Sequence, residues 1–300
     1  MEQIDNKTIE GLLLNEENIG ILESIIIKDK ERLEGLDNHN KKELDLGGIV
    51  RAKDFENEFK TAKEAALDYL DINVNEDPKI GNTNEKPGFY AFNLLRYIFY
   101  PGMALGCLNA LQTLPNVLEA AGVTAVSALS MLVMEIGWIF FKSQACYYQK
   151  EKKMFIAEVE RFNVLGSMMH EYGHFLFHIK DISKTPKNYL EHRTFEEGFC
   201  DSLKYSAGER LAEKEDNPDS LIHNLRRRIG NLQSVYKNMC RRKGIEIKKE
   251  ITERANRIPF VIQVNSMSTY GYGHAFCRIL EEKHGKEIYK KILEKDFSFL

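Results

Sequence analysis

The sequence predicts a mainly α-helical protein with a small β component. Apolar residues recur at intervals of three and four along much of the chain, which is the spacing of one helix face. Strand signals are few, and the run Ile258–Val264 is the best of them. With 300 residues, of which 43% are hydrophobic, the chain can bury a sizeable core in one large domain or two small ones.

The first region, residues 1–88, is predicted to be charged and helical. Its apolar residues form three short stripes at helical spacing: Leu12, Leu13 and Leu14; Ile21, Ile25 and Ile26; and Phe55, Phe59, Ala62, Ala66 and Leu70. The stretch NEDPKIGNTNEKPG at 75–88 is rich in Pro, Gly and Asn, which is typical of a linker. We therefore expect a first domain boundary near its end.

The second region, residues 89–150, is mostly apolar. Ala120–Phe141 is a run of 22 residues with one charge, Glu135, and this length is enough to cross a bilayer as a helix. Ile98–Leu114 is also apolar, although it is shorter and contains Pro101. Two interpretations stay open: a membrane hairpin through 98–141, or a pair of buried helices. The single charge favours membrane association of the second segment, and the lysines that follow it would leave both flanks cytoplasmic.

Charge, cysteines and the N-terminus exclude several classes of protein. The formal net charge of −3 gives no basic excess that would indicate nucleic-acid binding. The five cysteines are scattered and form no CxxC pair, so we expect neither a disulfide framework nor a cysteine zinc site. The first 20 residues are acidic and polar, unlike a signal peptide. The prediction is an intracellular protein, cytoplasmic or membrane-associated.

The third region, residues 151–300, is expected to consist mainly of helices. An amphipathic helix from about 157 to 180 is ended by Asp181, Ser183 and Pro186. Thr194 is expected to cap a further helix that runs to about Glu213, and basic helical segments follow between 220 and 256. Gly285 is expected to separate two final helices, Ser268–Lys283 and Lys286–Lys295.

The first of these helices contains the segment HEYGH, with His170, Glu171 and His174. Residues four apart lie on one helix face, so the two imidazoles can bind one zinc ion. Glu171 adjoins the first histidine, where its carboxylate can act as general base toward a water activated by zinc. His178 continues the spacing, but Phe175 stands where a second base would be needed. We interpret His178 as a packing residue or as a residue that supports a ligand from behind.

A third ligand is predicted downstream, in the segment FEEGFCDSL. Glu197 and Asp201 are four residues apart on one helix face, so Glu197 can complete the site while Asp201 accepts the outer N–H of a ligating histidine. The alternative is a capping box formed by Thr194 and Glu197. We favour the ligand, because capping would leave Asp201 and HEYGH unrelated. Glu196 is then expected to be exposed.

Together, HEYGH and EGFCD resemble the gluzincin zinc metallopeptidases, whose pattern is HExxH followed by ExxxD. The resemblance covers about residues 155–215 and implies a gluzincin-like core. The segment 268–293 is similar to the C-terminal helix of these enzymes, which carries a transition-state tyrosine. The resemblance implies this role for Tyr270, with Tyr272 as the alternative. No exopeptidase signature is found, so the subfamily stays open.

The sequence thus predicts a zinc peptidase that hydrolyses peptide bonds in a peptide or protein substrate. Two rivals stay open: a catalytically silent binding or regulatory protein with the same fold, and a membrane protein that contains these residues by coincidence.

Overall fold

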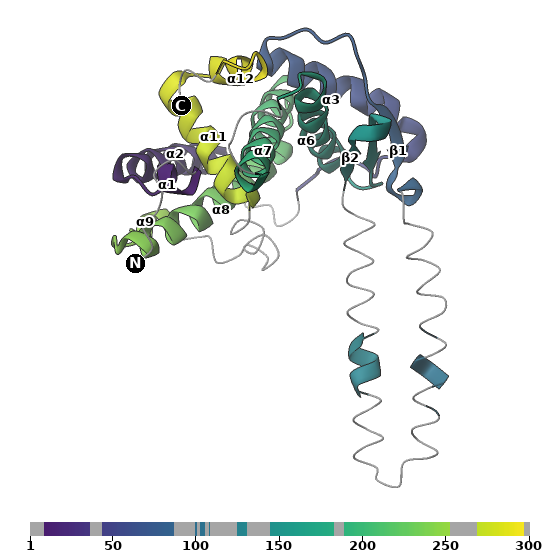
Figure 1. Cartoon of the computed structure of the whole chain (residues 1–300), viewed down its shortest axis with the longest axis horizontal. Coiled ribbons are helices and arrows are strands. Elements are labelled where there is room, and N and C mark those ends of the chain that lie inside the picture. The colour runs from purple at the N-terminus through teal and green to yellow at the C-terminus, as the bar shows by residue number, and fades with distance from the viewer. Residues whose placement is uncertain are drawn as a thin grey trace.

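The computed structural model describes residues 9–36, 44–86, 145–182, 189–252 and 269–296, together with 100, 103–105, 108 and 125–130 (Figure 1). The described part is mainly helical with a small sheet, as predicted. The α-helices are α1 Ile9–Leu13, α2 Glu16–Leu36, α3 Phe55–Leu70, α6 Arg161–Ile179, α7 Tyr189–Lys214, α8 Pro218–Lys243, α9 Lys249–Thr252, α11 Thr269–His284 and α12 Glu287–Leu293. The strands are β1 Lys79–Asn82, β2 Cys146–Tyr148 and β3 Lys153–Ile156, and the short 3₁₀ helices are η1 Ala52–Asp54, η2 Thr83–Glu85 and η3 Gln149–Glu151.

Helix α7 is the central element of the fold. It packs against α6, α8, α11 and α3, so helices from both ends of the chain surround it (Figure 1). Its neighbour α6 buries apolar side chains such as Leu165, Met169 and Phe175 almost completely. Burying such side chains stabilises the fold by about 1.5–3 kcal/mol each relative to leaving them exposed. The face of α6 that packs on α7 is therefore held by a buried apolar core.

The sheet is small and lies against α6. β1 pairs with β3 in parallel and β2 pairs with β3 antiparallel, which gives the order β1-β3-β2. The interpretation of 75–88 as a linker is therefore wrong for residues 79–82, which form β1. Pro, Gly and Asn suggested a linker, but the strand is fixed by hydrogen bonding to β3, more than 70 residues away, which no local pattern reveals. The run Ile258–Val264 lies outside the described residues.

The ends of two helices show local side-chain and backbone chemistry, and one of them was predicted. Asn217 caps α8, since its side chain accepts a hydrogen bond from the Ser220 amide at 3.0 Å, and Pro218 opens the helix. Gly285, with φ of +75°, separates α11 from α12 as predicted. The predicted cap at Thr194 is wrong, because α7 begins at Tyr189 and Thr194 lies inside it. The capping-box alternative for Glu197 is thereby removed.

The N-terminal helices share one hydrophobic cluster with the helices of the candidate site. Ile26 of α2 and Phe59 of α3 belong to the same cluster as Met169 of α6. A buried ion pair joins the same parts, since Arg228 Nε on α8 donates to Asp29 Oδ2 on α2 at 2.8 Å. Folding of the N-terminal helices is thus coupled to the packing of α7 and α8.

The predicted membrane hairpin at 98–141 lies almost wholly outside the described residues. Among the helices that the structure does describe, none is both long enough and apolar enough to span a bilayer. Four large apolar side chains in the described parts of this segment are exposed: Leu105, Leu108, Val126 and Leu129.

Candidate metal centre

Helix α6 presents His170 and His174 on one face, as their spacing predicts. The centroids of the two rings are 5.0 Å apart and the ring planes meet at 74°. Both residues are only partly exposed, with 12% and 17% of their side-chain surfaces accessible. Two imidazoles are thus fixed side by side in a mostly buried position.

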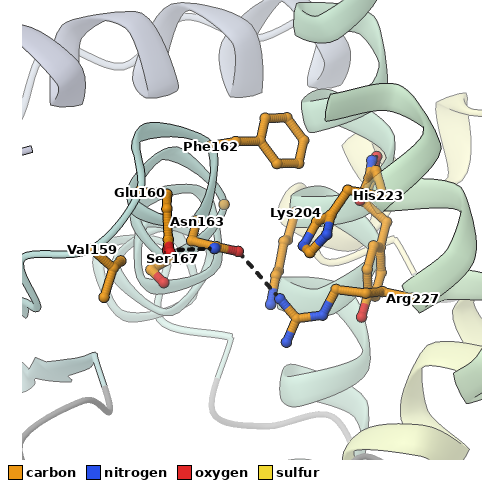
Figure 2. A pocket seen from close by; sticks show the side chains of 11 residues that line it. Val159, Glu160, Phe162, Asn163, Ser167, Lys204, His223 and Arg227 are labelled. Carbon is orange, nitrogen blue, oxygen red and sulfur yellow. Dashed lines mark hydrogen bonds between the residues drawn. The ribbon is translucent and has the colours of Figure 1, made fainter. Parts of the chain in front are cut away.

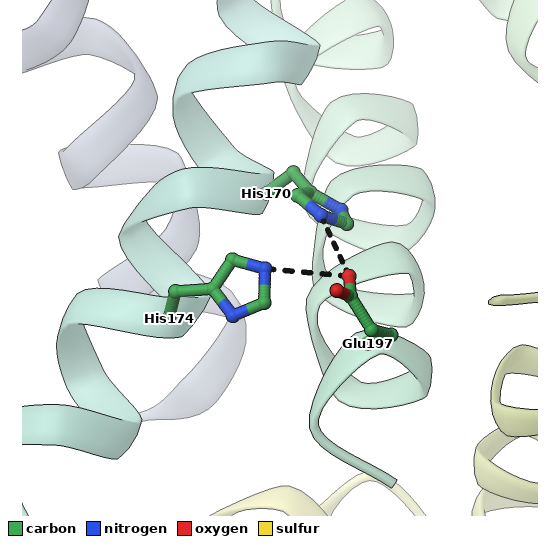
Figure 3. A group of neighbouring side chains, drawn as sticks. All are labelled: His170, His174 and Glu197. Atoms are coloured by element: carbon green, nitrogen blue, oxygen red, sulfur yellow. Dashed lines mark ion pairs between the residues drawn. The ribbon is translucent and has the colours of Figure 1, made fainter. Parts of the chain in front are cut away.

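Glu197 of α7 completes the cluster (Figure 3). Its Oε2 atom lies 3.3 Å from Nε2 of His170 and 3.3 Å from Nε2 of His174. Zinc bonds of about 2.0–2.1 Å in a tetrahedron place neighbouring ligand atoms roughly 3.3–3.4 Å apart. Oε2 is also buried and makes no hydrogen bond within the described part of the chain. The three donor atoms therefore fit a zinc ion, which would satisfy this oxygen.

Each histidine has a carboxylate behind it. Asp201 Oδ1 lies 2.9 Å from His170 Nδ1, although the ring N–H is not aligned well enough to count as a hydrogen bond. Glu196 Oε1 lies 2.8 Å from His174 Nδ1 and is hydrogen-bonded to it. Such contacts fix which ring nitrogen carries the proton and leave Nε2 free to bind a metal.

Glu196 is a residue that the sequence reasoning missed. We expected it to be exposed, but only 16% of its side-chain surface is accessible and it contacts His174. The sequence did contain an indication of this contact, because the side chains of two adjacent residues on one helix, here Glu196 and Glu197, diverge by about 100°. One can therefore face the metal while its neighbour reaches a ring from the side.

Glycines allow the three helices of the site to approach closely. A Cβ atom on Gly173 of α6 would lie 2.7 Å from Cys200 Sγ on α7. A Cβ atom on Gly273 of α11 would lie 1.9 Å from the Thr194 carbonyl oxygen, and one on Gly198 would lie 2.1 Å from the Gly273 carbonyl carbon. No side chain fits at the crossing of α7 and α11. This contact brings the N-terminal end of α11 next to Glu197.

Tyr270 is brought to the cluster by that crossing. Its ring lies nearly parallel to the ring of His170, at 24° with centroids 6.2 Å apart. Burial and the nearby Glu197 carboxylate raise the pKa of Tyr270 to about 12, so the phenol is neutral and can donate a hydrogen bond. Tyr272 points elsewhere, since its hydroxyl accepts a hydrogen bond from Asn238 on α8.

Glu171 is buried between α6 and the sheet side of the site. Only 6% of its surface is accessible. Burial lowers the pKa of Lys86, which follows η2, and the Glu171 carboxylate opposes this shift. Burial raises the pKa of the Cys146 thiol on β2, and Glu171 adds to this shift. Glu171 also adds to the effect of Asp201 and Glu197, which raise the pKa of His170 against burial. The carboxylate thus has cationic neighbours, which the sequence alone could not place beside it.

The carboxylates beside the two histidines raise the pKa of both rings. Burial by itself would lower the pKa of His170, but Asp201 and Glu197 outweigh burial and raise it to about 9. The pKa of His174 is also raised well above its ordinary value, with burial opposed by Cys200, Glu196 and Glu197. Burial would raise the pKa of Glu197, yet the two histidines hold it well below its usual range. The carboxylates therefore favour positive charge at both rings.

His178 is a packing residue, as interpreted from the sequence. Its Nδ1 is 2.7 Å from the Tyr147 hydroxyl on β2, and it is not part of the metal-binding cluster. The hydrogen bond joins the last turn of α6 to the sheet. The structure thus brings five predicted residues together: His170, His174, Glu197, Asp201 and Tyr270.

In comparisons with protein-family models, with curated proteins and with solved structures, no match to this chain was found.

Proposed function

We propose that the protein is a zinc-dependent peptidase with a gluzincin-like core. The observation that carries the proposal is the convergence of two imidazole Nε2 atoms on one buried, unsatisfied carboxylate oxygen, each 3.3 Å away. Two histidines and a glutamate are a known ligand set of catalytic zinc sites that leave one position open. Glu171, next to the first ligand in the sequence, supplies the base that hydrolysis requires.

His170, His174 and Glu197 would hold the zinc ion. When bound, zinc supplies Lewis acidity that makes a water easier to deprotonate and a carbonyl easier to attack. Glu171 would act as the general base that receives the proton of the attacking water. The same carboxyl group can then pass this proton to the leaving amine. Its buried surroundings keep the proton from exchanging freely with solvent.

Tyr270 is proposed to stabilise the oxyanion of the tetrahedral intermediate. Its phenol is neutral, and its ring is stacked beside His170 at the edge of the cluster. A hydroxyl that is already positioned can donate to the developing negative charge without reorganisation. Glu196 positions one ring through its hydrogen bond to Nδ1 of His174, and Asp201 lies 2.9 Å from Nδ1 of His170, where it would favour the tautomer with its proton on that atom.

The test is zinc stoichiometry combined with peptide hydrolysis. We expect the purified wild-type chain to bind one zinc ion and Glu197→Ala to lose it, because the only carboxylate ligand is removed. Glu171→Gln should keep the zinc ion and lose about 10²–10⁴-fold in turnover, because only the base is removed.

Glu213→Ala is the matched control, since Glu213 lies on the same helix α7 and half of its side-chain surface is exposed. It should keep both zinc and activity. A wild-type chain without zinc would contradict the metal centre. A zinc-loaded chain that cleaves no peptide in a broad library would instead support a silent binding protein.

A further inference from the structure

A polar pocket lies between α6, α7 and α8 (Figure 2). Its volume is about 280 Å³. This lies just below the roughly 300–1,000 Å³ of pockets that enclose whole small ligands, so it suits one side chain or one chain end. Its polar lining includes Asn163, Ser167, Lys204, His223, Asn224 and Arg227.

The pocket and the candidate metal ligands are carried by the same two helices, α6 and α7. On α6, Ser167 precedes His170 by three residues, which places both on one face. On α7, Lys204 follows Asp201 by three residues, and Asp201 follows Glu197 by four. With a rise of about 1.5 Å per residue, the α6 side of the pocket begins roughly 5 Å along the axis from His170. A peptide held at the metal centre would therefore reach it with a neighbouring residue.

Two cations face this pocket without an ion-pair partner among the described residues. Lys204 makes no hydrogen bond in that part of the chain, and the Arg227 guanidinium makes one long hydrogen bond, 3.4 Å to Asn163 Oδ1 (Figure 2). Burial and the nearby Arg227 lower the pKa of Lys204, while Asp201 and Glu171 raise it. Like charges placed together in a partly buried pocket are destabilising unless an anion joins them.

A third group offers a donor to the same space. His223 Nε2 is buried and has no hydrogen-bond partner among the described residues. Burial, Arg227 and Lys204 lower the pKa of His223 to about 4, so the ring is neutral and keeps one N–H to donate. The pocket also contains one carboxylate, Glu160, which accepts a hydrogen bond from Asn163 Nδ2 at 3.0 Å. Its presence leaves a small positive excess, which suits a singly charged anion better than a doubly charged phosphate.

We propose that this pocket is a substrate subsite that binds a carboxylate through Lys204, Arg227 and His223. The carboxylate belongs to a peptide, either as an Asp or Glu side chain or as the C-terminal group. The inference rests on the proposed peptidase function, because it supplies the substrate class for that site. Arginine suits the task, since its planar guanidinium can bind both oxygens of a carboxylate.

Binding of defined peptides to the metal-free chain tests the proposal without hydrolysis. The probes are blocked heptapeptides of alanine that carry a central Glu or a central Gln, and the Gln peptide with a free C-terminal carboxylate. Affinities are measured by calorimetry. We expect one of the two acidic probes to bind at least about 10-fold more tightly than the blocked Gln peptide, the effect of one charge-assisted contact. The stronger of the two identifies the source of the carboxylate.

Variants assign this preference to the pocket. Lys204→Met and Arg227→Met should lose most of it, while Arg227→Lys should keep part of it. Arg226→Met is the matched control, because Arg226 is exposed, lies on the same helix and does not line the pocket. Thermal unfolding checks that each variant is folded.

The proposal is wrong if neither acidic probe binds more tightly than the Gln peptide, including the case in which no probe binds. It is also wrong if the preference survives both substitutions to Met. Zinc binding and hydrolysis by the same wild-type preparation would leave the proposed function intact in either case. A wild-type chain that binds no zinc would instead contradict the proposed function. The peptide affinities of the metal-free chain would then still support or overturn the carboxylate subsite.

Discussion

At the scale of single residues, the site depends on which atom of each side chain faces inward. Both histidines turn Nε2 toward Glu197 and Nδ1 toward an outer carboxylate. The neutral ring with its proton on Nδ1 is the tautomer that can bind a metal through Nε2. Asp201 and Glu196 would therefore contribute to metal affinity through the histidines, without contacting a bound ion themselves.

Tyr270→Phe is expected to lower kcat by about 10²–10³-fold, as for loss of one oxyanion donor. Zinc content and KM should change little, because the ring still stacks beside His170. Tyr272→Phe is the matched control, since that hydroxyl is bonded to Asn238 instead. Steady-state kinetics on a validated peptide substrate measure both. The reverse order of effects would mean that Tyr272 is the donor.

Zinc affinity is expected to rise with pH. The pKa of His170 in the metal-free protein is about 9, and that of His174 is raised as well. A protonated ring cannot bind zinc, so zinc must displace these protons and binds less well as pH falls. Each displaced proton changes the apparent affinity about tenfold per pH unit below that pKa. Competition with a chelator between about pH 6.5 and 8.5 measures this slope, and a flat profile would contradict it.

At the scale of elements, the site exists because α6, α7 and α11 cross at glycines. Gly198 and Gly273 place two backbones in contact, and Tyr270 lies one turn before Gly273 on α11. Helices of ordinary composition keep their axes 8–10 Å apart. A closer crossing is possible here only because neither residue has a side chain. The position of the tyrosine relative to Glu197 depends on this crossing.

Gly198→Ala is expected to destabilise the protein by about 1–3 kcal/mol or more, because the added methyl group would overlap the backbone of Gly273. The loss of activity should exceed what the loss of folded protein explains, since α11 and Tyr270 would be displaced. Gly20→Ala is the control: Gly20 lies inside α2 with nothing within 4 Å of an added Cβ atom. This substitution should stabilise by roughly 0.5–1 kcal/mol. Denaturant unfolding distinguishes the two, and equal effects would contradict the role of the crossing.

At the scale of the whole molecule, the chain joins its first helices to the site by a shared core and by the buried pair Arg228–Asp29. Removing one partner of such a pair typically costs about 3–5 kcal/mol. β1 adds a second connection, because it pairs with β3, which leads directly into α6. The N-terminal helices are thus part of the structure that supports the metal centre.

Membrane association through 98–141 stays a prediction. Val126 and Leu129 are described and are 66% and 61% exposed, which suits a segment that contacts lipid. We expect the expressed protein to stay in the membrane pellet after carbonate extraction. Val126→Lys together with Leu129→Lys should move it to the supernatant, because a lysine near the centre of a membrane helix costs about 2.5–3.5 kcal/mol. Recovery of the unmodified chain in the supernatant without detergent would favour buried helices.

The sequence by itself determined the features that depend on local spacing. The four-residue interval of His170 and His174 places both rings on one face of any α-helix, and Gly285 marks a helix end because glycine readily adopts positive φ. Glu197 and Asp201 were found for the same reason, since their interval also places them on one face.

The tertiary structure alone decided the features that depend on distant contacts. β1 was missed because its hydrogen-bond partner is distant in the sequence. Thr194 was misread as a helix cap because the helix continues before it. Glu196 was placed at His174 only by the packing of α7 against α6, which also set its Oε1 atom 2.8 Å from the ring. The resemblance had already favoured Tyr270, but its ring lies beside His170 only because α7 and α11 cross where two glycines without side chains let the backbones touch.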